Sequence, residues 1–235
     1  DRATLETVQL ARLKTTIQQA SRAPFYAKRL AEAGVSADNL RSLEDIRRIP
    51  FTSKDDLRSQ YPYGLATVPH SEFVRMHCSS GTTGTPVAVC YTQPDINSWA
   101  DLMARCLYMA GVRKDDVFQN MSGYGLFTGG LGIHFGAERL GCMTIPAGAG
   151  NSKRQLKLVK DFGTTVAHIL PSYALHLGTT LIEEGEDPKA LSLRIACVGA
   201  EPYTEETRRR IEALFDMKVY NSYGLSEMNG PGVAF

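Results

Sequence analysis

The segment from Ser79 to Pro86 has the composition of a loop that could bind phosphate groups. It reads SSGTTGTP, so hydroxyl side chains are interleaved with two glycines between two predicted strands. Glycine lets the backbone curl and present successive N–H groups to an anion, and hydroxyl groups add further donors. The candidate phosphate ligands are Ser79, Ser80, Gly81, Thr82, Thr83 and Gly84. A Walker loop is excluded because G-x-x-x-x-G-K-[ST] is absent, whereas a ligand-free hairpin or surface loop is an alternative that composition leaves open.

A second segment, from Tyr220 to Glu227, could contact a nucleotide and a metal ion. Its sequence YNSYGLSE follows a predicted strand and places an aromatic ring, a glycine, a hydroxyl group and a carboxylate between Tyr223 and Glu227. An aromatic ring can stack on a purine, and a carboxylate can hold Mg²⁺ that is bound to phosphates. The alternative is an amphipathic strand end with a solvent-exposed glutamate. Since the two segments lie far apart in the sequence, only the fold can bring them together.

Alternating strand and helix patterns from residue 73 onward predict an α/β fold. The predicted strands are Phe73–Cys78, Val87–Tyr91, Val117–Asn120, Met143–Pro146, Val166–Leu170, Arg194–Val198 and Lys218–Asn221. The predicted helices are Ile96–Ala110, Leu131–Leu140, Lys153–Phe162, Ser172–Glu184 and Thr204–Phe215. Such alternation is typical of βαβ units around a largely parallel sheet flanked by helices. Ligands of these sheets usually lie beyond the carboxyl ends of the strands.

The chain before this region is predicted to be helical. Leu10, Leu13, Ile17 and Ala20 recur at helical spacing and form one apolar stripe. Further along, Thr52 or Ser53 is placed to cap a helix with acidic residues in its first turn. We therefore expect an N-terminal helical segment over 1–72 and an α/β region over 73–235.

Composition and charge argue against several classes of protein. Hydrophobic residues make up 43% and charged residues 22% of the chain, an ordinary globular balance. The net charge of +1 gives no reason to expect a nucleic acid partner. The five cysteines include no C-x-x-C pair, which argues against a disulfide framework and favours a reducing, cytoplasmic setting. The sequence shows no metal-ligand spacing of cysteine and histidine, no signal peptide and no apolar run long enough to cross a membrane.

The two chemistry-bearing segments together resemble the core motifs of the adenylate-forming superfamily, which includes acyl-CoA synthetases, luciferases and peptide-synthetase adenylation domains. Further strings are similar to those of the phenylacetate–CoA ligase family, in that family's order, from about Cys78 to the end of the chain. These strings are QNMSGYGLFTGGLG from Gln119, GAERLG from Gly136, PSYAL from Pro171, GAEP from Gly199 and GPGVA from Gly230. The chain therefore resembles the N-terminal portion of such a ligase.

The resemblance implies an enzyme that activates an aryl carboxylic acid such as phenylacetate, with ATP, Mg²⁺ and coenzyme A. It implies Tyr223 against the adenine and Ser226 near the α-phosphate. It also implies Glu227 as the Mg²⁺ ligand, and Thr82 and Glu227 as the catalytic residues. The remaining implied nucleotide-binding residues after the phosphate loop are Gly199, Ala200, Glu201, Pro202, Asn221, Ser222 and Gly224. Tyr124, Phe127 and Gly129 would line the acyl pocket, so the α/β region over 73–235 would bind both the nucleotide and the acyl group.

Three positions depart from the family pattern. Thr85 stands where a lysine is common, Ser122 where a tyrosine is common, and Asn221 where an aspartate is common. Without the lysine, charge neutralisation of pyrophosphate would fall on Mg²⁺ and backbone dipoles, and Ser122 would enlarge the acyl pocket. We assign His77 and His134 to structure, because an ionised carboxylate needs no general base for adenylation.

Members of the resembled family continue beyond this point with an aspartate that holds the ribose, a hinge and a mobile C-terminal domain with a catalytic lysine. We therefore expect this chain to be a fragment that is inactive alone, from an enzyme that could form a homodimer. Two alternatives stay open. One is an adenylating enzyme with an acceptor other than coenzyme A, and the other is a non-catalytic nucleotide-binding fragment.

Overall fold

The computed structural model describes residues 1–235 apart from 80–83, 229 and 232–235, and the chain divides into two compact units. One unit is Asp1–Gln93 and the other is Pro94–Phe235. The sequence analysis expects a boundary at residue 72, between a helical segment and a ligand-binding region. This division by ligand binding stays a prediction.

The first unit opens with helices that pack around a small apolar core. They are α1 (Arg2–Ala20), α2 (Pro24–Glu32) and α3 (Lys54–Ser59), with short 3-10 helices at Ala37–Asn39, Leu43–Arg48 and His70–Glu72. The core contains Ile17, Leu30, Val35 and Leu40, so the predicted apolar stripe of α1 does face inward. Of the two candidate caps, Ser53 caps α3 by accepting the Asp56 N–H at 3.1 Å.

The strands β1 (Phe73–Cys78) and β2 (Ala88–Thr92) pair antiparallel and form a sheet of their own. They are therefore not part of the parallel sheet that the alternating pattern predicts. Residues 79–87 are too few for the connection between parallel strands, which takes about a dozen residues or more and usually a helix.

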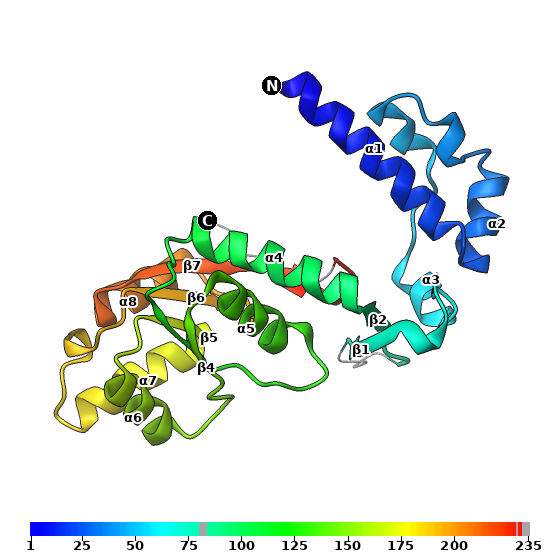
Figure 1. Ribbon diagram of the computed structural model, residues 1–235. Coiled ribbons are helices and arrows are strands. Elements are labelled where there is room, and N and C mark those ends of the chain that lie inside the picture. The colour runs from blue at the N-terminus through cyan, green and yellow to red at the C-terminus, as the bar shows by residue number, and fades with distance from the viewer. Residues whose placement is uncertain (80–83, 229, 232–235) are drawn as a thin grey trace. The chain divides into compact units, whose positions relative to one another are not determined.

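The second unit contains a parallel sheet of five strands, as predicted (Figure 1). The strands are β3 (Val117–Asn120), β4 (Met143–Ile145), β5 (Val166–Ile169), β6 (Ile195–Gly199) and β7 (Lys218–Ser222). Their order in the sheet is β4-β3-β5-β6-β7, and each neighbouring pair is parallel. The central strands β5 and β6 are buried along their whole length, which matches sequences that are apolar apart from His168.

Helices cover both faces of this sheet. They are α4 (Gln93–Met109), α5 (Thr128–Leu140), α6 (Ser152–Phe162), α7 (Pro171–Glu183) and α8 (Glu205–Phe215). Alternate strand residues such as Ala167, Ile169 and Val198 form one core with the apolar faces of α6, α7 and α8. The intervening strand residues point to the opposite face, where α4 packs closely against α5. After β7 the chain forms the two-residue strands β8 (Gly224–Leu225) and β9 (Gly230–Pro231), which pair antiparallel.

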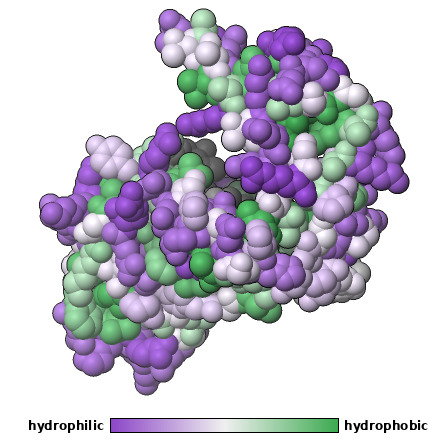
Figure 2. Space-filling view, turned by 45° about the vertical axis from the view of Figure 1, so that its right-hand side comes forward, coloured by the Kyte–Doolittle hydropathy of each residue, from purple (hydrophilic) through white to green (hydrophobic). Residues whose placement is uncertain are grey.

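The surface is mainly hydrophilic in the view of Figure 2, with smaller hydrophobic areas between the polar ones. Among the described residues, no helix combines the length and the apolar character needed to cross a bilayer.

An ion pair ties the amino ends of β3 and β6 together. Asp116 is buried, and it accepts hydrogen bonds from the Arg194 guanidinium, from the backbone N–H of Arg113 at 2.7 Å and from the Thr165 hydroxyl at 2.7 Å. Burial raises the pKa of the Asp116 carboxyl, but these hydrogen bonds outweigh burial and hold that pKa below its ordinary value.

A second side-chain contact secures the outer edge of β7. Glu212 of α8 accepts the backbone N–H of Val219 at 3.1 Å and the Arg208 guanidinium at 2.7 Å. The backbone N–H of Lys218, one residue earlier, donates to the backbone carbonyl of Arg194, on the side of β7 that faces β6. The Val219 N–H therefore points to the unpaired side, and Glu212 gives it an acceptor.

We predict that Asp116→Asn lowers the free energy of unfolding at neutral pH by about 1–3 kcal/mol, because a charge-assisted network loses its anion. A carboxyl with a depressed pKa stabilises the fold above its unfolded pKa, and that stabilisation is lost as the pH falls through the folded pKa. The difference between variant and wild type should therefore shrink in acid. Urea unfolding at several pH values measures it, with the exposed neighbour Asp115→Asn as the control; a pH-independent difference would contradict this account.

We also predict that Gly132→Ala destabilises the second unit, because a Cβ there would lie 2.4 Å from the Trp99 ring. Overpacking of this kind costs about 1–3 kcal/mol. Gly129→Ala, in the same helix, has open space at the Cβ position and should be neutral or slightly stabilising. Thermal unfolding of both variants checks this prediction, and equal melting temperatures would refute it.

Candidate active site

The parallel sheet brings three of the predicted site segments to one edge. Because all five strands run the same way, the loops after β3, β6 and β7 leave from the same, carboxyl edge. These loops carry the predicted acyl-pocket residues, the Gly199–Pro202 segment and the Tyr220–Glu227 segment. Their shared position follows from strand direction alone.

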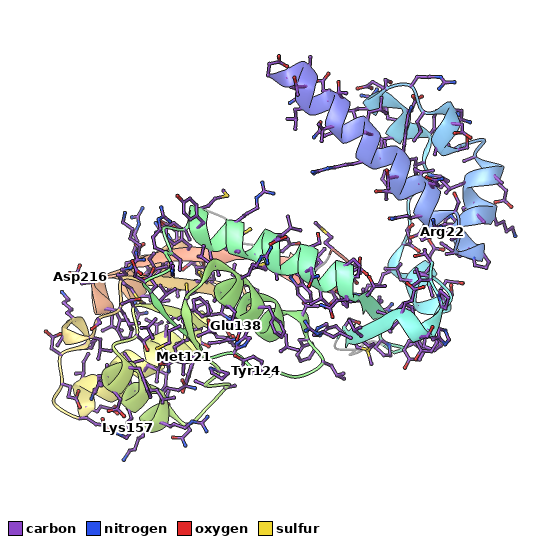
Figure 3. The ribbon with its side chains drawn as sticks, viewed as in Figure 1. Arg22, Met121, Tyr124, Glu138, Lys157 and Asp216 are labelled. Atoms are coloured by element: carbon purple, nitrogen blue, oxygen red, sulfur yellow. The ribbon has the colours of Figure 1, made fainter. Side chains whose placement is uncertain are left out.

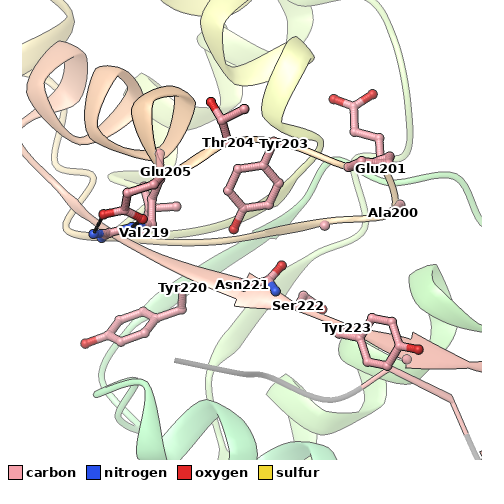
Figure 4. Close-up of a pocket in the computed structure, with 14 residues that line it drawn as sticks. Ala200, Glu201, Tyr203, Thr204, Glu205, Val219, Tyr220, Asn221, Ser222 and Tyr223 are labelled. Carbon is pink, nitrogen blue, oxygen red and sulfur yellow. Dashed lines mark hydrogen bonds and ion pairs between the residues drawn. The ribbon is translucent and has the colours of Figure 1, made fainter.

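A cleft of about 890 Å³ lies between the ends of β6 and β7 (Figure 4). Eight of the predicted nucleotide-binding residues line it, namely Gly199, Ala200, Glu201, Pro202, Asn221, Ser222, Tyr223 and Gly224. Its other lining residues are Tyr203, Thr204, Glu205, Arg208, Val219 and Tyr220. The volume is in the range of small-molecule sites in proteins. Two segments that are separate in the sequence therefore form one cavity.

The backbone of the Gly199–Pro202 segment is tightly constrained. A Cβ on Gly199 would lie 2.1 Å from the carbonyl oxygen of Ser222, so only glycine lets β6 and β7 approach this closely. Ala200 has a φ of 68°, in the left-handed region that favours glycine. The Glu201 carboxylate accepts the backbone N–H of Ser172 at 2.6 Å and so links the segment to the start of α7.

Three tyrosines, Tyr203, Tyr220 and Tyr223, contribute to the walls of the cleft. Tyr223 leaves 64% of its surface exposed, so its ring is available to a ligand. Tyr203 contacts the apolar core on one side and lines the cleft on the other, and burial raises the pKa of its hydroxyl. Figure 4 shows its ring extending from the β6–α8 connection toward β7. Our sequence reading missed Tyr203, although it directly follows the Gly199–Pro202 segment.

The one arginine of the cleft lining is already paired. Arg208 donates to Glu205 at 2.6 Å and to Glu212 at 2.7 Å. Its hydrogen bonds are the main cause that lowers the pKa of the Glu205 carboxyl to about 2. A phosphate group would have to compete with two carboxylates for Arg208, so this side chain is poorly suited to bind phosphate.

The loop after β3 is held by buried polar side chains. Asn120 donates to the carbonyl of Gly130 at 2.7 Å and accepts the N–H of Ser122 at 3.1 Å. The same oxygen lies 3.0 Å from His168 Nδ1, so that nitrogen carries the proton. Burial lowers the pKa of His168 to about 4, which keeps the ring neutral. Asn120 therefore fixes both ends of the loop that contains Tyr124.

Tyr124 precedes α5 and makes the first of two successive side-chain contacts that lead to residues of this helix. Its hydroxyl lies 3.1 Å from His134 Nδ1, and His134 Nε2 lies 3.1 Å from Glu138 Oε1. Figure 3 labels Tyr124 and Glu138, the first and last residues of this series of contacts. Both ring nitrogens of His134 have partners, which agrees with a structural role for this residue. Burial raises the pKa of Tyr124, so its hydroxyl keeps its proton.

The other two predicted acyl-pocket residues lie at the start of α5. Phe127 directly precedes the helix and leaves 57% of its surface exposed, so it is not an ordinary core phenylalanine. Gly129 has no atom within 4 Å of its Cβ position. Tyr124, Phe127 and Gly129 lie at the carboxyl edge but are not part of the cleft lining.

The predicted phosphate loop belongs to the first unit. Ser79 accepts the Val87 N–H at 2.9 Å, and its own N–H donates to the Val87 carbonyl at 2.9 Å, which closes the β1–β2 hairpin. Gly84 has a φ of 126°, which requires glycine. Ser80, Gly81, Thr82 and Thr83 lie outside the described residues, so a joint site of Thr82 and Glu227 stays a prediction.

Ser226 and Glu227 lie in a short 3-10 helix, Ser226–Met228, which follows β8. The Glu227 side chain is exposed and Ser226 is half-buried. Within the described residues, no group of three or more His, Cys, Asp or Glu side chains could hold a metal ion. A metal ion held by Glu227 would therefore need further oxygen ligands, such as substrate phosphates, water or backbone carbonyls.

Comparison with known proteins shows that the sequence is similar to phenylacetate–coenzyme A ligases. It is 49% identical over 227 residues to a phenylacetate–coenzyme A ligase of Pseudomonas putida, covering 96% of this chain and 52% of that protein. It is 47% identical over 234 residues to the phenylacetate–coenzyme A ligase of Thermus thermophilus, covering 99% of this chain and 53% of that protein. The chain thus spans about half the length of these relatives.

Solved structures agree with the sequence comparison. A 2-hydroxyisobutyryl-CoA ligase in complex with its acyl-AMP and CoA superimposes with a TM-score of 0.91 at 32% identity. The match covers 99% of this chain and 52% of that chain. The sequence also matches the AMP-binding enzyme family over residues 9–234. Since this match spans nearly the whole sequence, the chain belongs to the family of AMP-binding enzymes.

Proposed function

We propose that the protein activates an aryl carboxylic acid, phenylacetate in the first instance, with ATP and transfers the acyl group to coenzyme A. The observation that carries this proposal is the single cleft formed by eight predicted nucleotide-binding residues from two separate segments. The similarity to phenylacetate–coenzyme A ligases, at 43–49% identity, supports the choice of acid.

The first half-reaction makes the carboxylate a better acyl donor. A carboxylate oxygen attacks the α-phosphorus of ATP, the bond to the β-phosphate oxygen breaks, and pyrophosphate leaves. The acyl group is then attached to AMP, which is a good leaving group. In the second half-reaction the sulfur of coenzyme A attacks the acyl carbon, the thiol proton is released, and AMP leaves with the bonding electrons.

The cleft residues would hold the nucleotide during both steps. In this proposal the adenine lies between the Tyr223 ring and the Gly199–Pro202 segment, where aromatic stacking contributes about 0.5–1.5 kcal/mol beyond apolar burial. Ser226 would lie near the α-phosphate, and the hydroxyl-rich loop from Ser79 to Gly84 would bind the outer phosphates. Such preorganised donors stabilise developing charge without reorganising during the reaction.

The chemistry of Glu227 fits a magnesium ion. Mg²⁺ prefers oxygen ligands and is usually held by one or two carboxylates together with substrate phosphates and water. An exposed glutamate beside the nucleotide segment supplies one such carboxylate, and the described residues contain no competing metal cluster. Bound there, the ion would neutralise charge on the phosphates. The chain's own contribution would be to hold and orient it through Glu227.

The acyl group would bind along the loop after β3. Tyr124 and Phe127 offer aromatic surfaces suited to a phenyl ring. The contacts of Tyr124 with His134 would fix the orientation of its ring. A small residue at Ser122 would leave room for acids bulkier than phenylacetate.

The setting and assembly of the protein are also part of the proposal. All five cysteines are free thiols, which fits a reducing cytoplasm. The near-neutral charge favours small-molecule partners over nucleic acid, and we expect neither a membrane nor a nucleic acid among them. A homodimer is the assembly we expect, and light scattering measures it directly.

We predict that the complete gene product forms AMP, pyrophosphate and an acyl thioester in equal amounts from phenylacetate, ATP, Mg²⁺ and coenzyme A. Without coenzyme A, turnover should stop after about one adenylate per active site, because the acyl-AMP has no acceptor. Chromatography of products with a panel of aryl and aliphatic acids checks this prediction. Amide or ester formation, with no response to coenzyme A, would show a different acceptor and contradict the proposal.

We predict that Glu227→Gln weakens the binding of ATP–Mg²⁺ by about tenfold or more, because a carboxylate ligand of a hard cation is lost. The binding of AMP without metal should change little. Titration calorimetry of the complete gene product measures both, with the exposed Glu184→Gln as the matched control. If Glu227→Gln binds ATP–Mg²⁺ as tightly as the wild type, the metal role of Glu227 is wrong.

A further inference from the structure

Glu201 lines the cleft, but its carboxylate is engaged elsewhere. Its Oε1 atom lies 2.6 Å from the backbone nitrogen of Ser172, which donates the hydrogen bond. Figure 4 shows the carboxylate pointing away from Asn221 and Ser222 on the opposite wall. The charged group therefore faces the start of α7 and not the interior of the cleft.

The start of α7 needs this acceptor. The first N–H groups of a helix have no partner within the helix. The residue before α7, Leu170, makes no side-chain cap, and Pro171 has no N–H, so Ser172 carries the first N–H that requires an acceptor. A carboxylate at this position also interacts favourably with the positive end of the helix dipole. Glu201 thus serves α7 as a cap supplied from a distant part of the chain.

The segment that carries Glu201 needs support in turn. Ala200 has a φ of 68°, a conformation that is unfavourable for a residue with a side chain. On the side facing β7, Gly199 packs against the Ser222 carbonyl. On the other side, Glu201 is joined to α7, whose residues Ala174, Leu177 and Leu181 are buried in the core. The segment is therefore secured at both ends to rigid elements.

We propose that Glu201 is a positioning residue of the nucleotide cleft, which holds the Gly199–Pro202 wall in its binding shape through α7 and makes no contact with the base. This inference rests on the proposed function. Nucleotide affinity then depends on Glu201 through the shape of the wall, and any acceptor of the same length at position 201 fulfils the role.

The test is the affinity of the complete gene product for AMP and for inosine monophosphate, measured by titration calorimetry. Glu201→Ala should weaken both nucleotides by about tenfold, since a hydrogen bond to a charged group is lost. Glu201→Gln keeps an acceptor oxygen at the same reach and should stay within about twofold of the wild type. Inosine monophosphate lacks the 6-amino group, so an equal loss for both nucleotides supports positioning.

Two controls separate this role from general destabilisation. Asn151→Ala removes the side-chain cap of α6, another helix of the same unit, whose Arg154 N–H lies 3.1 Å from the Asn151 oxygen. It should lower stability comparably and leave AMP affinity unchanged. Glu206→Ala removes an exposed acid from the first turn of α8, outside the cleft lining, and should lower stability slightly while AMP affinity stays unchanged.

Several outcomes overturn the inference. Equal weakening of AMP binding by Glu201→Ala and Asn151→Ala would attribute the effect to stability. A loss with AMP but not with inosine monophosphate would make Glu201 a direct ligand of the base. If the wild type binds AMP and Glu201→Ala binds it equally well, the inference alone fails. If the wild type binds neither AMP nor ATP, the proposed function fails as well.

Discussion

Strand direction is the constraint on which the candidate site depends. In a parallel sheet every strand delivers the chain to the same edge, and every connecting helix returns it to the other. Residues that follow β3, β6 and β7 therefore lie along the same edge of the sheet, although more than a hundred positions of sequence separate Asn120 from Ser222. The helices on both faces make this arrangement rigid, because the central strands contribute to the core on either side.

Buried polar side chains adapt this common architecture to a particular site. Gln119 accepts a hydrogen bond from the Thr164 hydroxyl and donates one to the Gln155 side chain. Gln155 in turn donates a hydrogen bond to the carbonyl of Gly148. Asn120 makes the corresponding contacts for the loop that follows β3. Polar groups in such positions destabilise the fold unless every partner is present. Here hydrogen bonds to these partners offset the free-energy cost of burying the polar side chains. The same hydrogen bonds fix the loops at the carboxyl edge of the sheet.

The sequence allowed the α-helices and the parallel strands of the second unit to be predicted to within a few residues, because their apolar patterns and glycine or proline boundaries are strong. The short strands β8 and β9 were not predicted. The antiparallel pairing of β1 and β2 could have been predicted from the short connection between them, but strand patterns alone do not show pairing. The positions of Gly199 and Asn221 in one cleft followed from motif resemblance and from the parallel sheet.

Other features of the site could not be predicted in this way. Tyr203 has no distinctive motif of its own, and its place in the cleft depends on how the β6–α8 connection turns. The contact of Glu201 with Ser172 joins two segments that are far apart in the sequence, and neither residue type predicts this contact. Likewise, the engagement of Arg208 by two carboxylates depends on the faces that α8 presents. Contacts between side chains and distant backbone leave no periodic signal in a sequence.

The acceptor that Glu212 provides for Val219 also affects how copies of this chain meet. An outer strand with unsatisfied N–H groups is a template on which a strand of another molecule can pair, and such pairing leads to aggregates. At β7 a carboxylate already occupies the donor that an incoming strand would need, and its negative charge is balanced by Arg208. Intermolecular pairing at this point would first have to break the hydrogen bond between Val219 and Glu212. The same small cluster that lies beside the cleft thus protects the sheet edge from self-association.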